Sequence, residues 1–295
     1  MPENCTAYRL INAEGDGIPG LVADIYGKVV VLQATTCGIE KLKESIVEIL
    51  IKLLAPSSIY EKSQGKAREQ EGLESSEKLL YGKKIDEVQI EENGIKFLVR
   101  PEAGQKTGFF LDQREMRALV MRHAQGRRVL NCFSYTGGFS LAALKGGAQS
   151  ATSIDICADA LALAERNCAL NDFSHTVVKQ DVFDYLKEST LPFDLVILDP
   201  PAFAKKRSDV MNACRGYKEI NRLAIQKMPP GSLLLTSSCS HYIDETLFQN
   251  LLFQAAHEAG RTVKILSRHH NAFDHPLSLY HPEGHYLKSL LLYIN

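Results

Sequence analysis

The stretch RRVLNCFSYTGG, residues 127–138, constrains the fold of this chain more than any other segment. Its apolar start, Arg128–Asn131, predicts a short buried strand, and the small and polar residues that follow predict a turn at Ser134–Gly138. The apolar pattern of a helix resumes at Leu141–Leu144. A strand that leads through such a turn into a helix presents backbone N–H groups at the carboxyl end of the strand, where open α/β sheets bind nucleotide-like ligands.

Acidic residues follow the next strands of the same pattern. Asp155 and Asp199 come directly after segments that read as short strands, and Asp181 comes two residues after the strand expected at 175–179. Because the carboxyl ends of parallel strands share one edge of a sheet, we expect these carboxylates to lie at that edge. An acid at the position of Asp155 can accept hydrogen bonds from both hydroxyls of a ribose. The turn and the three acids together predict a nucleoside site.

From Val129 onward, short apolar strands alternate with helices, which predicts a largely parallel, doubly wound sheet. No helical pattern separates the last two strands, so we expect them to form an antiparallel hairpin at one edge, as in a Rossmann-like class I methyltransferase sheet. The expected strands are 128–131, 151–154, 175–179, 194–198, 232–236, 262–267 and 286–293, and the expected helices are 138–145, 157–170, 213–228 and 244–258.

The first hundred residues follow a different pattern, that of a small α+β subdomain. Short strand candidates surround a helical stretch at 39–54, and Val88–Glu91 and Ile95–Val99 read as a hairpin joined by Glu92-Asn93-Gly94. Ser63–Ser76 is polar and charged, and we expect an exposed, mobile loop there. We therefore expect two domains, 1–103 and 104–295, with a helix capped near Asp112 at the start of the second.

Composition excludes several classes of protein. The net charge of −1 excludes a protein that coats nucleic acid, so any RNA must contact a local patch. No run of about 18 apolar residues is present, so no membrane span is expected. Seven cysteines without a Cys-x-x-Cys pair, and an amino terminus without a signal-peptide pattern, indicate the reducing cytoplasm rather than a disulfide framework. The scattered histidines near the carboxyl end lack the spacing of a zinc site, and we expect no metal.

The turn Ser134–Gly138 contains neither a P-loop nor a Gly-x-Gly-x-x-Gly cradle, so a nucleotide phosphate is not its expected ligand. S-adenosylmethionine carries no phosphate and can be held by a looser turn. We predict that it binds here, with Asp155 on the ribose and Asp181 and Val182 at the edge of the adenine.

Two features beyond the cofactor turn suggest an acceptor site. Asp199-Pro200-Pro201 can form a rigid rim that holds a planar base, although a Pro-Pro pair can also simply end a strand. Cys239 follows the neighbouring strand of the predicted sheet. A buried cysteine is usually a packing residue, but a thiolate facing this rim could add to C6 of a pyrimidine and make C5 nucleophilic.

The chain resembles the class I RNA methyltransferases of the RlmI type, which make 5-methylcytidine in bacterial large-subunit (23S) ribosomal RNA. The resemblance covers nearly the whole chain, in RLINAEGDGIPGL (9–21), TGFFLDQRE (107–115), VLNCFSYTGGFS (129–140), DPPAF (199–203), ACRGYKEIN (213–221), LLTSSCS (234–240) and DHP…PEGHYLK (274–288). It implies that Cys239 and Asp199 are catalytic residues. It also implies a cofactor site lined by Asn131, Ser134, Tyr135, Asp155, Asp181 and Asp199, in which Thr136 and Gly137 complete the turn.

The chain departs from related families in two places. Nothing before Arg9 is long enough for the RNA-binding PUA domain with which longer members begin, so we expect that domain to be missing. The two-cysteine cytosine methyltransferases carry a cysteine after the proline of the rim, where this chain has Ala202. The way in which the protein binds RNA therefore stays open. Whether the protein forms a homodimer also stays open.

Two alternatives remain. Asp-Pro-Pro followed by Phe203 also resembles the rim that grips an exocyclic amino group, which would make the product an N-methylated base and leave Cys239 without a role. A non-catalytic RNA-binding assembly factor is the other alternative, and it would not need Asp155, Asp199 and Cys239 together. The basic residues of Lys205–Lys218 next to the rim are the expected contacts to RNA phosphates.

Overall fold

The structure is a computed structural model that describes residues 4–204 and 206–295. Its internal contacts divide the chain into two units. The first unit runs up to Arg114 and includes Ala272–Gly284, and the second contains Glu115–Asn271 and His285–Asn295. By these contacts the connector 104–114 and the segment 272–284 belong to the first unit. The division into domains 1–103 and 104–295 stays a prediction.

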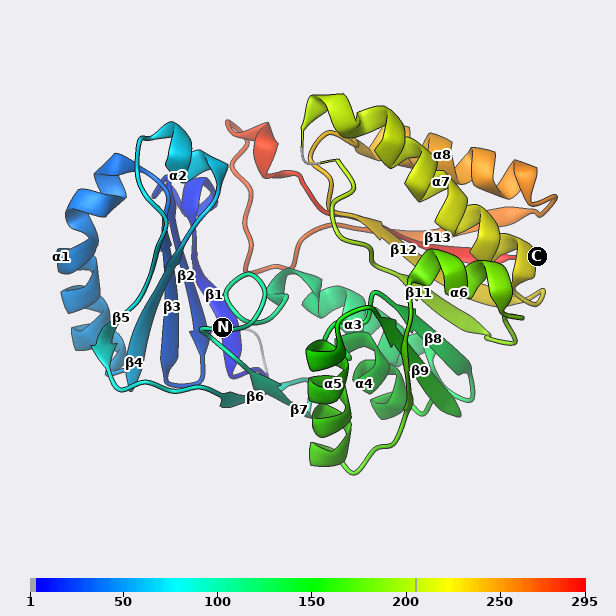
Figure 1. The fold of residues 1–295 in the computed structure, drawn as a ribbon, viewed down its shortest axis with the longest axis horizontal. Helices are drawn as coiled ribbons and strands as arrows, with labels where there is room; N and C mark the ends of the chain where they lie inside the picture. The colour runs from blue at the N-terminus through cyan, green and yellow to red at the C-terminus, as the bar shows by residue number, and fades with distance from the viewer. Residues whose placement is uncertain (1–3, 205) are drawn as a thin grey trace. The chain divides into compact units, whose positions relative to one another are not determined.

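The second unit is built on a seven-stranded sheet with the strand order β10-β9-β8-β11-β12-β14-β13 (Figure 1). The first five strands in this order are parallel, and β14 runs antiparallel to both β12 and β13. This confirms the Rossmann-like sheet with an antiparallel hairpin at one edge. The strands are β8 (Arg128–Cys132), β9 (Ser150–Asp155), β10 (Thr176–Lys179), β11 (Leu195–Leu198), β12 (Ser232–Ser238), β13 (Val263–His269) and β14 (Lys288–Ile294).

Helices cover both faces of this sheet. The helices α6 (Val182–Glu188), α7 (Val210–Lys227) and α8 (Glu245–Glu258) pack on one face, and α3 (Arg114–His123) and α4 (Gly138–Lys145) pack on the other. Alongside α4 lies α5 (Ala158–Leu170). Because both faces are covered, the central strand β11 is apolar and buried along its whole length.

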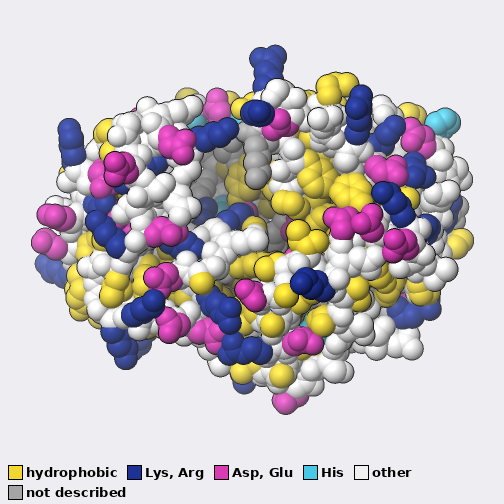
Figure 2. Space-filling model, in the orientation of Figure 1, with side chains coloured by type: hydrophobic (Ala, Val, Ile, Leu, Met, Phe, Trp, Pro, Cys, Tyr) yellow, Lys and Arg dark blue, Asp and Glu magenta, His cyan; other side chains and the backbone are white. Residues whose placement is uncertain are grey.

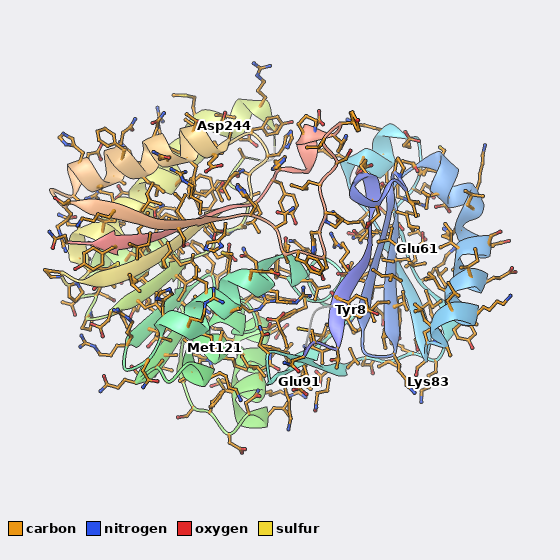
Figure 3. All side chains as sticks on the ribbon, turned by 180° about the vertical axis from the view of Figure 1, so that it is seen from behind. Tyr8, Glu61, Lys83, Glu91, Met121 and Asp244 are labelled. Atoms are coloured by element: carbon orange, nitrogen blue, oxygen red, sulfur yellow. The ribbon has the colours of Figure 1, made fainter. Side chains whose placement is uncertain are left out.

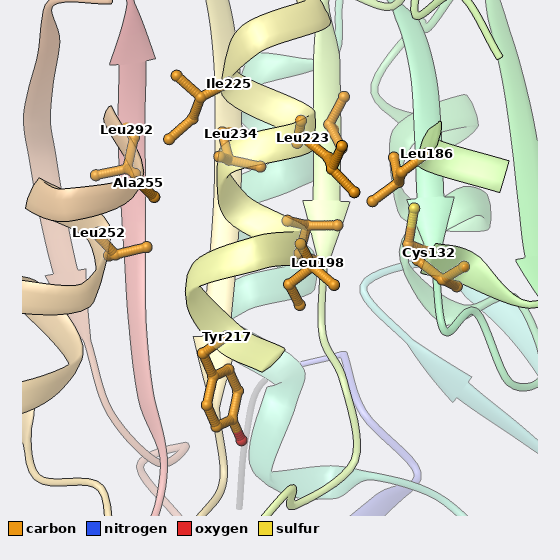
Figure 4. Packing of buried hydrophobic residues seen from close by; sticks show 14 of the residues in the cluster. Cys132, Leu186, Leu198, Tyr217, Leu223, Ile225, Leu234, Leu252, Ala255 and Leu292 are labelled. Carbon is orange, nitrogen blue, oxygen red and sulfur yellow. The ribbon is translucent and has the colours of Figure 1, made fainter. Parts of the chain in front are cut away.

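The largest buried cluster lies between the sheet and the helices α6, α7 and α8. Figure 4 shows Leu198 of β11 and Leu234 of β12 facing Leu223 of α7, while Leu252 of α8 lies with Ala255 at the strand of Leu292. Tyr217, one of the largest fully buried side chains, packs at the end of the cluster toward the carboxyl ends of the strands. This cluster fixes α7 against the two strands that carry the predicted acceptor residues.

Two helices of the second unit differ from the sequence-based expectation. The seven-residue helix α6 was not expected, because it is too short to show a clear apolar period. The helix α7 begins at Val210, three residues before the predicted start at 213, and follows a 3₁₀ turn at Arg207–Asp209.

The first unit contains a five-stranded sheet in the order β1-β2-β3-β4-β5. The strands β3 and β4 are parallel and are joined by α1 (Cys37–Leu54), whose Ile39 and Leu50 pack on the sheet, and the other pairs are antiparallel. The strands are β1 (Ala7–Asn12), β2 (Leu21–Tyr26), β3 (Val29–Ala34), β4 (Ser58–Ser63) and β5 (Ser76–Gly82). The hairpin of β6 (Val88–Glu92) and β7 (Ile95–Val99) turns through Asn93 and Gly94, both at positive φ, as a two-residue hairpin turn requires.

The expectation of an exposed loop at Ser63–Ser76 was wrong in part. This segment contains a short helix, α2 (Lys66–Gln70), and the side chain of Arg68 is buried. Its Nη1 donates to the carbonyl of Ala34 at 2.7 Å and to Glu40 at 2.7 Å. The nearby Glu61 carboxylate is also buried in the sheet (Figure 3) and pairs with Lys43 at 2.9 Å. The sequence of this segment is polar, so it did not predict these buried charges. The groups that pair with them, such as the Ala34 carbonyl for Arg68, lie far away in the chain.

The segment Ala272–Gly284 is fixed to the first unit through Asp274. Its carboxylate accepts from the backbone N–H of Arg9 at 2.9 Å and from the Arg114 guanidinium at 2.9 Å. His275 is buried beside it, with Nδ1 2.9 Å from the other carboxylate oxygen. The segment between β13 and β14 thereby becomes part of the first unit.

Candidate active site

The turn Ser134–Gly138 leads from β8 into α4, as the sequence predicts. The backbone N–H of Ser134 donates to the carbonyl of Ile154 in β9 at 2.9 Å, and the N–H of Gly137 donates back to Ser134 at 2.9 Å. Phe133 and Tyr135 have φ values of 58° and 47°, a conformation that non-glycine residues rarely adopt. No side chain caps α4, so its first N–H groups face the end of the turn. Strain of this kind concentrates at ligand sites.

Asp155 at the end of β9 organises this turn. Its Oδ2 accepts from the N–H of Tyr135 at 2.8 Å, and its Oδ1 accepts from the N–H of Cys157 at 2.9 Å. An ionised carboxylate has about four acceptor positions, so Asp155 can still accept from the two hydroxyls of a ribose. The next residue, Ile156, is apolar and 67% exposed. It offers a surface for an adenine ring, and sequence reasoning missed it although an apolar residue after the acid was visible.

Buried polar atoms at the turn are suited to bind a polar ligand. Within the described residues, Ser134 Oγ and Asn131 Oδ1 are buried without a hydrogen-bond partner, a costly state unless a ligand or water satisfies them. Asn131 also donates from Nδ2 to Ser140 Oγ at 3.0 Å, which ties β8 to α4. These residues fit S-adenosylmethionine, whose polar amino-acid and ribose groups need partners of this kind.

Three other residues of the predicted cofactor site have structural roles in this unit. Asp181 is exposed and caps α6, because its Oδ1 accepts from the N–H groups of Phe183 at 2.8 Å and Asp184 at 3.2 Å. The side chain of Val182 is buried in the core, so only its main chain can address a ligand. Thr136 is buried and its carbonyl accepts from Asn167 at 3.1 Å.

The structure brings Cys239 to the predicted rim. Asp199 follows β11 and Cys239 follows β12, and these two strands are parallel neighbours. Cys239 Sγ donates to the carbonyl oxygen of Pro200 at 3.7 Å. Cys239 is partly exposed, whereas Pro200 is buried. The thiol therefore borders the rim, as the order of the strands predicts.

A second set of hydrogen bonds fixes the segment that carries Cys239. The hydroxyl of Ser240 pairs with the Tyr217 hydroxyl at 2.9 Å and accepts from the N–H of Ala204 at 3.2 Å. The Tyr217 ring packs on Phe203 with ring centroids 4.6 Å apart. The Lys288 ammonium donates to the carbonyl of Ser240 at 2.8 Å. Sequence reasoning gave no role to Tyr217 or Lys288, although both lie in the motifs that carry the family resemblance.

Two other cysteines near the turn are poorly suited to act as nucleophiles. Burial raises the pKa of the Cys132 thiol strongly and raises the pKa of Cys168 to about 12. None of the seven cysteines, all of which lie in the described residues, forms a disulfide bond. Among the residues that the structure describes, no group of histidines, cysteines and acids could hold a metal ion, and no helix has the length and apolarity needed to cross a bilayer.

The basic loop beside the rim is exposed where the structure describes it. Lys206 and Arg207 are exposed at the start of the 3₁₀ turn, and Lys205 lies outside the described residues. Lys218, which was also expected to contact phosphate, pairs with Glu258 at 2.8 Å. Over the face shown in Figure 2, basic and acidic side chains are intermingled, so a local patch and not a general field has to attract RNA.

Comparison with known proteins gives matches along nearly the whole chain. The model of a family described as S-adenosylmethionine-dependent methyltransferase matches residues 25–291. Ribosomal RNA large subunit methyltransferase I of Aeromonas salmonicida is 45% identical over 98% of this chain and 75% of its own length. The protein of the same name from Vibrio vulnificus is 44% identical over 97% and 74%. The crystal structure of SMU.776, complexed with SAH, superposes with a TM-score of 0.86 at 28% identity and covers 99% of this chain and 76% of that one.

Proposed function

The chain belongs to the S-adenosylmethionine-dependent methyltransferases, in the family of ribosomal RNA large subunit methyltransferase I, and we propose that it methylates C5 of a cytidine in 23S ribosomal RNA through a covalent bond to Cys239. It is an RNA methyltransferase that uses S-adenosylmethionine. We also propose a cytoplasmic location, where ribosomal RNA is available as substrate. The position of the methyl group, the covalent step and the residue roles below are parts of the proposal.

Residues of the turn and of the strand ends would hold the cofactor. Ser134 Oγ and the N–H groups at the start of α4 would bind its polar groups, and Asp155 would accept from the ribose hydroxyls. Ile156 would cover one face of the adenine, with Asp181 and the main chain of Val182 at its edge. When bound, S-adenosylmethionine supplies a methyl group that is electrophilic because it is attached to a sulfonium.

Cys239 makes the target carbon reactive. C5 of cytosine is a poor nucleophile, and the bond that forms between the Cys239 thiolate and C6 moves the electrons of the C5–C6 double bond onto C5. C5 can then take the methyl group. A base afterwards removes the C5 proton, the C5–C6 double bond re-forms and the C6–S bond breaks, so that the thiolate is regenerated.

The rim holds the ring during this addition. Asp199 and Pro200 follow the end of β11, and the carbonyl oxygen of Pro200 lies 3.7 Å from the sulfur. A carboxyl group that is protonated, or that reaches N3 of the base through a water, would stabilise the charge that develops on the ring. The rigid proline backbone limits the positions that the base can take.

The observation that carries the proposal is the contact between Cys239 and Pro200 at the ends of adjacent strands. Nucleoside mass spectrometry of ribosomal RNA treated with the purified enzyme tests the proposal. We expect 5-methylcytidine with the wild type, none with Cys239→Ala, and an unchanged amount with the control Cys37→Ala, whose thiol lies at the start of α1 in the first unit. An N-methylated base formed equally by Cys239→Ala would support the alternative, transfer to an exocyclic amino group.

A further inference from the structure

A buried lysine lies behind the proposed nucleophile. Lys288 is the first residue of β14 and is only 4% exposed. Its Nζ donates to the carbonyl oxygens of Ser240 and Tyr286, each at 2.8 Å. Among the described residues no carboxylate forms a salt bridge with it. Burying an ammonium without a carboxylate costs free energy, so this lysine is a poor choice for packing alone.

The register of the sheet places Lys288 beside the segment that carries Cys239. In the antiparallel pair of β12 and β14, Lys288 is opposite Ser238. Its hydrogen bond to the Ser240 carbonyl therefore joins Lys288 to the residue that directly follows Cys239. Because the Ser240 hydroxyl is also held by Tyr217 and Ala204, the backbone on the carboxyl side of Cys239 is fixed from three directions.

The charge of Lys288 acts on the Cys239 sulfur. Burial lowers the pKa of Lys288 to about 8, and the negative charges of Cys239 and Asp244 oppose that shift. A Coulomb interaction is mutual, so a thiolate that favours the ammonium is itself favoured by it. Asp244 is exposed at the start of α8 (Figure 3), and burial raises the pKa of Tyr217, which keeps its hydroxyl neutral. Near neutral pH, below its own pKa, Lys288 is therefore a positive group whose charge favours the thiolate.

The hydrogen bond from Cys239 to Pro200 opposes formation of the thiolate. The protonated thiol donates to the carbonyl of Pro200, which favours the neutral form. A thiol is a weak donor at 3.7 Å, whereas a charge in a partly buried position interacts strongly. We expect the charge of Lys288 to outweigh that hydrogen bond.

We propose that Lys288 is a positioning residue for Cys239: it fixes the segment Ser238–Ser240 through the Ser240 carbonyl and places a positive charge beside the sulfur, so that the thiolate is present before RNA binds. The inference rests on the proposed function, since it gives the thiolate its use. It assigns Lys288 no contact with the base or the cofactor.

The test is the rate at which iodoacetamide alkylates Cys239 as a function of pH, followed on the Cys239 peptide by mass spectrometry in the RNA-free protein. Replacing Lys288 by methionine keeps the length of the side chain and removes its charge. The pH midpoint of alkylation should rise by about one unit or more in Lys288→Met, the size expected when a nearby opposite charge is lost. Lys288→Arg should keep the midpoint near that of the wild type.

Lys227→Met is the matched control. Lys227 also donates its ammonium protons to backbone carbonyls, those of Leu186, Lys187 and Ser189. It is the last residue of α7 and does not contact the segment that carries Cys239 in any of these bonds. This variant should leave the midpoint unchanged. If Lys288→Met does not fold, as judged by circular dichroism, Lys288→Gln provides the same comparison with a neutral donor.

Methyl transfer gives a second readout. Lys288→Met should lower kcat at pH 7 by about tenfold or more with little change in KM for RNA, and the loss should shrink as the pH rises and the thiol ionises unaided. An alkylation midpoint that does not move in Lys288→Met would overturn the inference, whether or not the enzyme is active. A Cys239→Ala variant that still methylates RNA would instead overturn the proposed function and leave the alkylation result standing.

Discussion

The sulfur of Cys239 lies 3.7 Å from the carbonyl oxygen of Pro200, and the two residues follow adjacent parallel strands of the sheet. Residues 39 positions apart in the sequence are thereby joined at the edge where the cofactor turn also ends. A cysteine used only for packing would not need a partly exposed place at this edge. The arrangement instead suits a nucleophile that must reach a base lying on the rim.

Loss of the Asp155 carboxylate should weaken S-adenosylmethionine binding. Asp155→Ala removes the proposed acceptor for the ribose hydroxyls and also the hydrogen bond from the N–H of Tyr135, which loosens the turn. We expect a loss of about 1–3 kcal/mol in binding free energy, the cost of leaving buried polar groups unpaired. Isothermal titration calorimetry measures this loss. Asp159→Ala, an exposed acid in the first turn of α5, is the control and should bind normally. Equal affinity in the two variants would show that the ribose is bound elsewhere.

The exposed basic loop should contribute to RNA binding through phosphate contacts. We expect the joint replacement of Lys205, Lys206 and Arg207 by glutamine to weaken RNA binding and to flatten its dependence on salt. Each lost phosphate contact lowers the slope of log K against log salt by about 0.7 for single-stranded RNA, because fewer counterions are released. Fluorescence anisotropy at several salt concentrations measures the slope.

The control for this loop replaces three exposed lysines elsewhere in the second unit, Lys145, Lys187 and Lys264. It changes the net charge by the same amount. The slope of this control should match that of the wild type. If both triple variants flatten the slope equally, total charge and not the loop determines RNA affinity.

Asp274 should make the stability of the protein depend on pH. Burial raises the pKa of its carboxyl, but the hydrogen bonds from His275 and Arg114 outweigh this and hold the pKa well below its usual range. The stabilisation is therefore complete above the unfolded-state pKa of about 4 and is lost as the pH falls toward the folded value. Asp274→Asn should lower the free energy of unfolding by about 2 kcal/mol at pH 7, a moderate value for a partner removed from a buried ion pair.

Thermal unfolding of the wild type and Asp274→Asn at pH 7, 5 and 3 measures this effect. The difference in Tm should be largest at pH 7 and should shrink at pH 3, as the wild-type carboxylate begins to lose its advantage. Asp86→Asn, at an exposed position in the same unit, should leave Tm unchanged at each pH. A difference for Asp274→Asn that does not vary with pH would mean that the carboxylate is not the stabilising group.

The sequence predicted the second unit more completely than the first. Continuous apolar strands such as Leu195–Leu198, separated by amphipathic helices, leave few alternatives to a parallel sheet, and acids at strand ends mark its active edge. The hairpin at Asn93-Gly94 was equally readable, because its turn requires residues that tolerate positive φ. The burial of the Arg68 charge could not be predicted from the sequence, because the carbonyl of Ala34 that it binds comes close only in the fold.

The same distinction applies to the active site. Cys239 and Asp199 could be paired from the sequence because neighbouring strands bring their ends together. Lys288 could not, because its role depends on a strand that enters the sheet antiparallel, out of chain order, between β12 and β13. Local sequence patterns identify the ends of strands. Which side chains come into contact near those ends depends on how strands that are distant in the sequence pair in the sheet.

The most direct test of the account is whether RNA that contains 5-fluorocytidine becomes covalently attached to Cys239. Fluorine at C5 leaves no proton for the base to remove, so the bond between C6 and the sulfur should persist after methylation. Denaturing electrophoresis with S-adenosylmethionine present should show a protein–RNA adduct whose linked peptide contains Cys239, and Cys239→Ala should form none. An enzyme that methylates ordinary RNA but forms no adduct with the fluorinated RNA, together with an active Cys239→Ala variant, would contradict covalent catalysis.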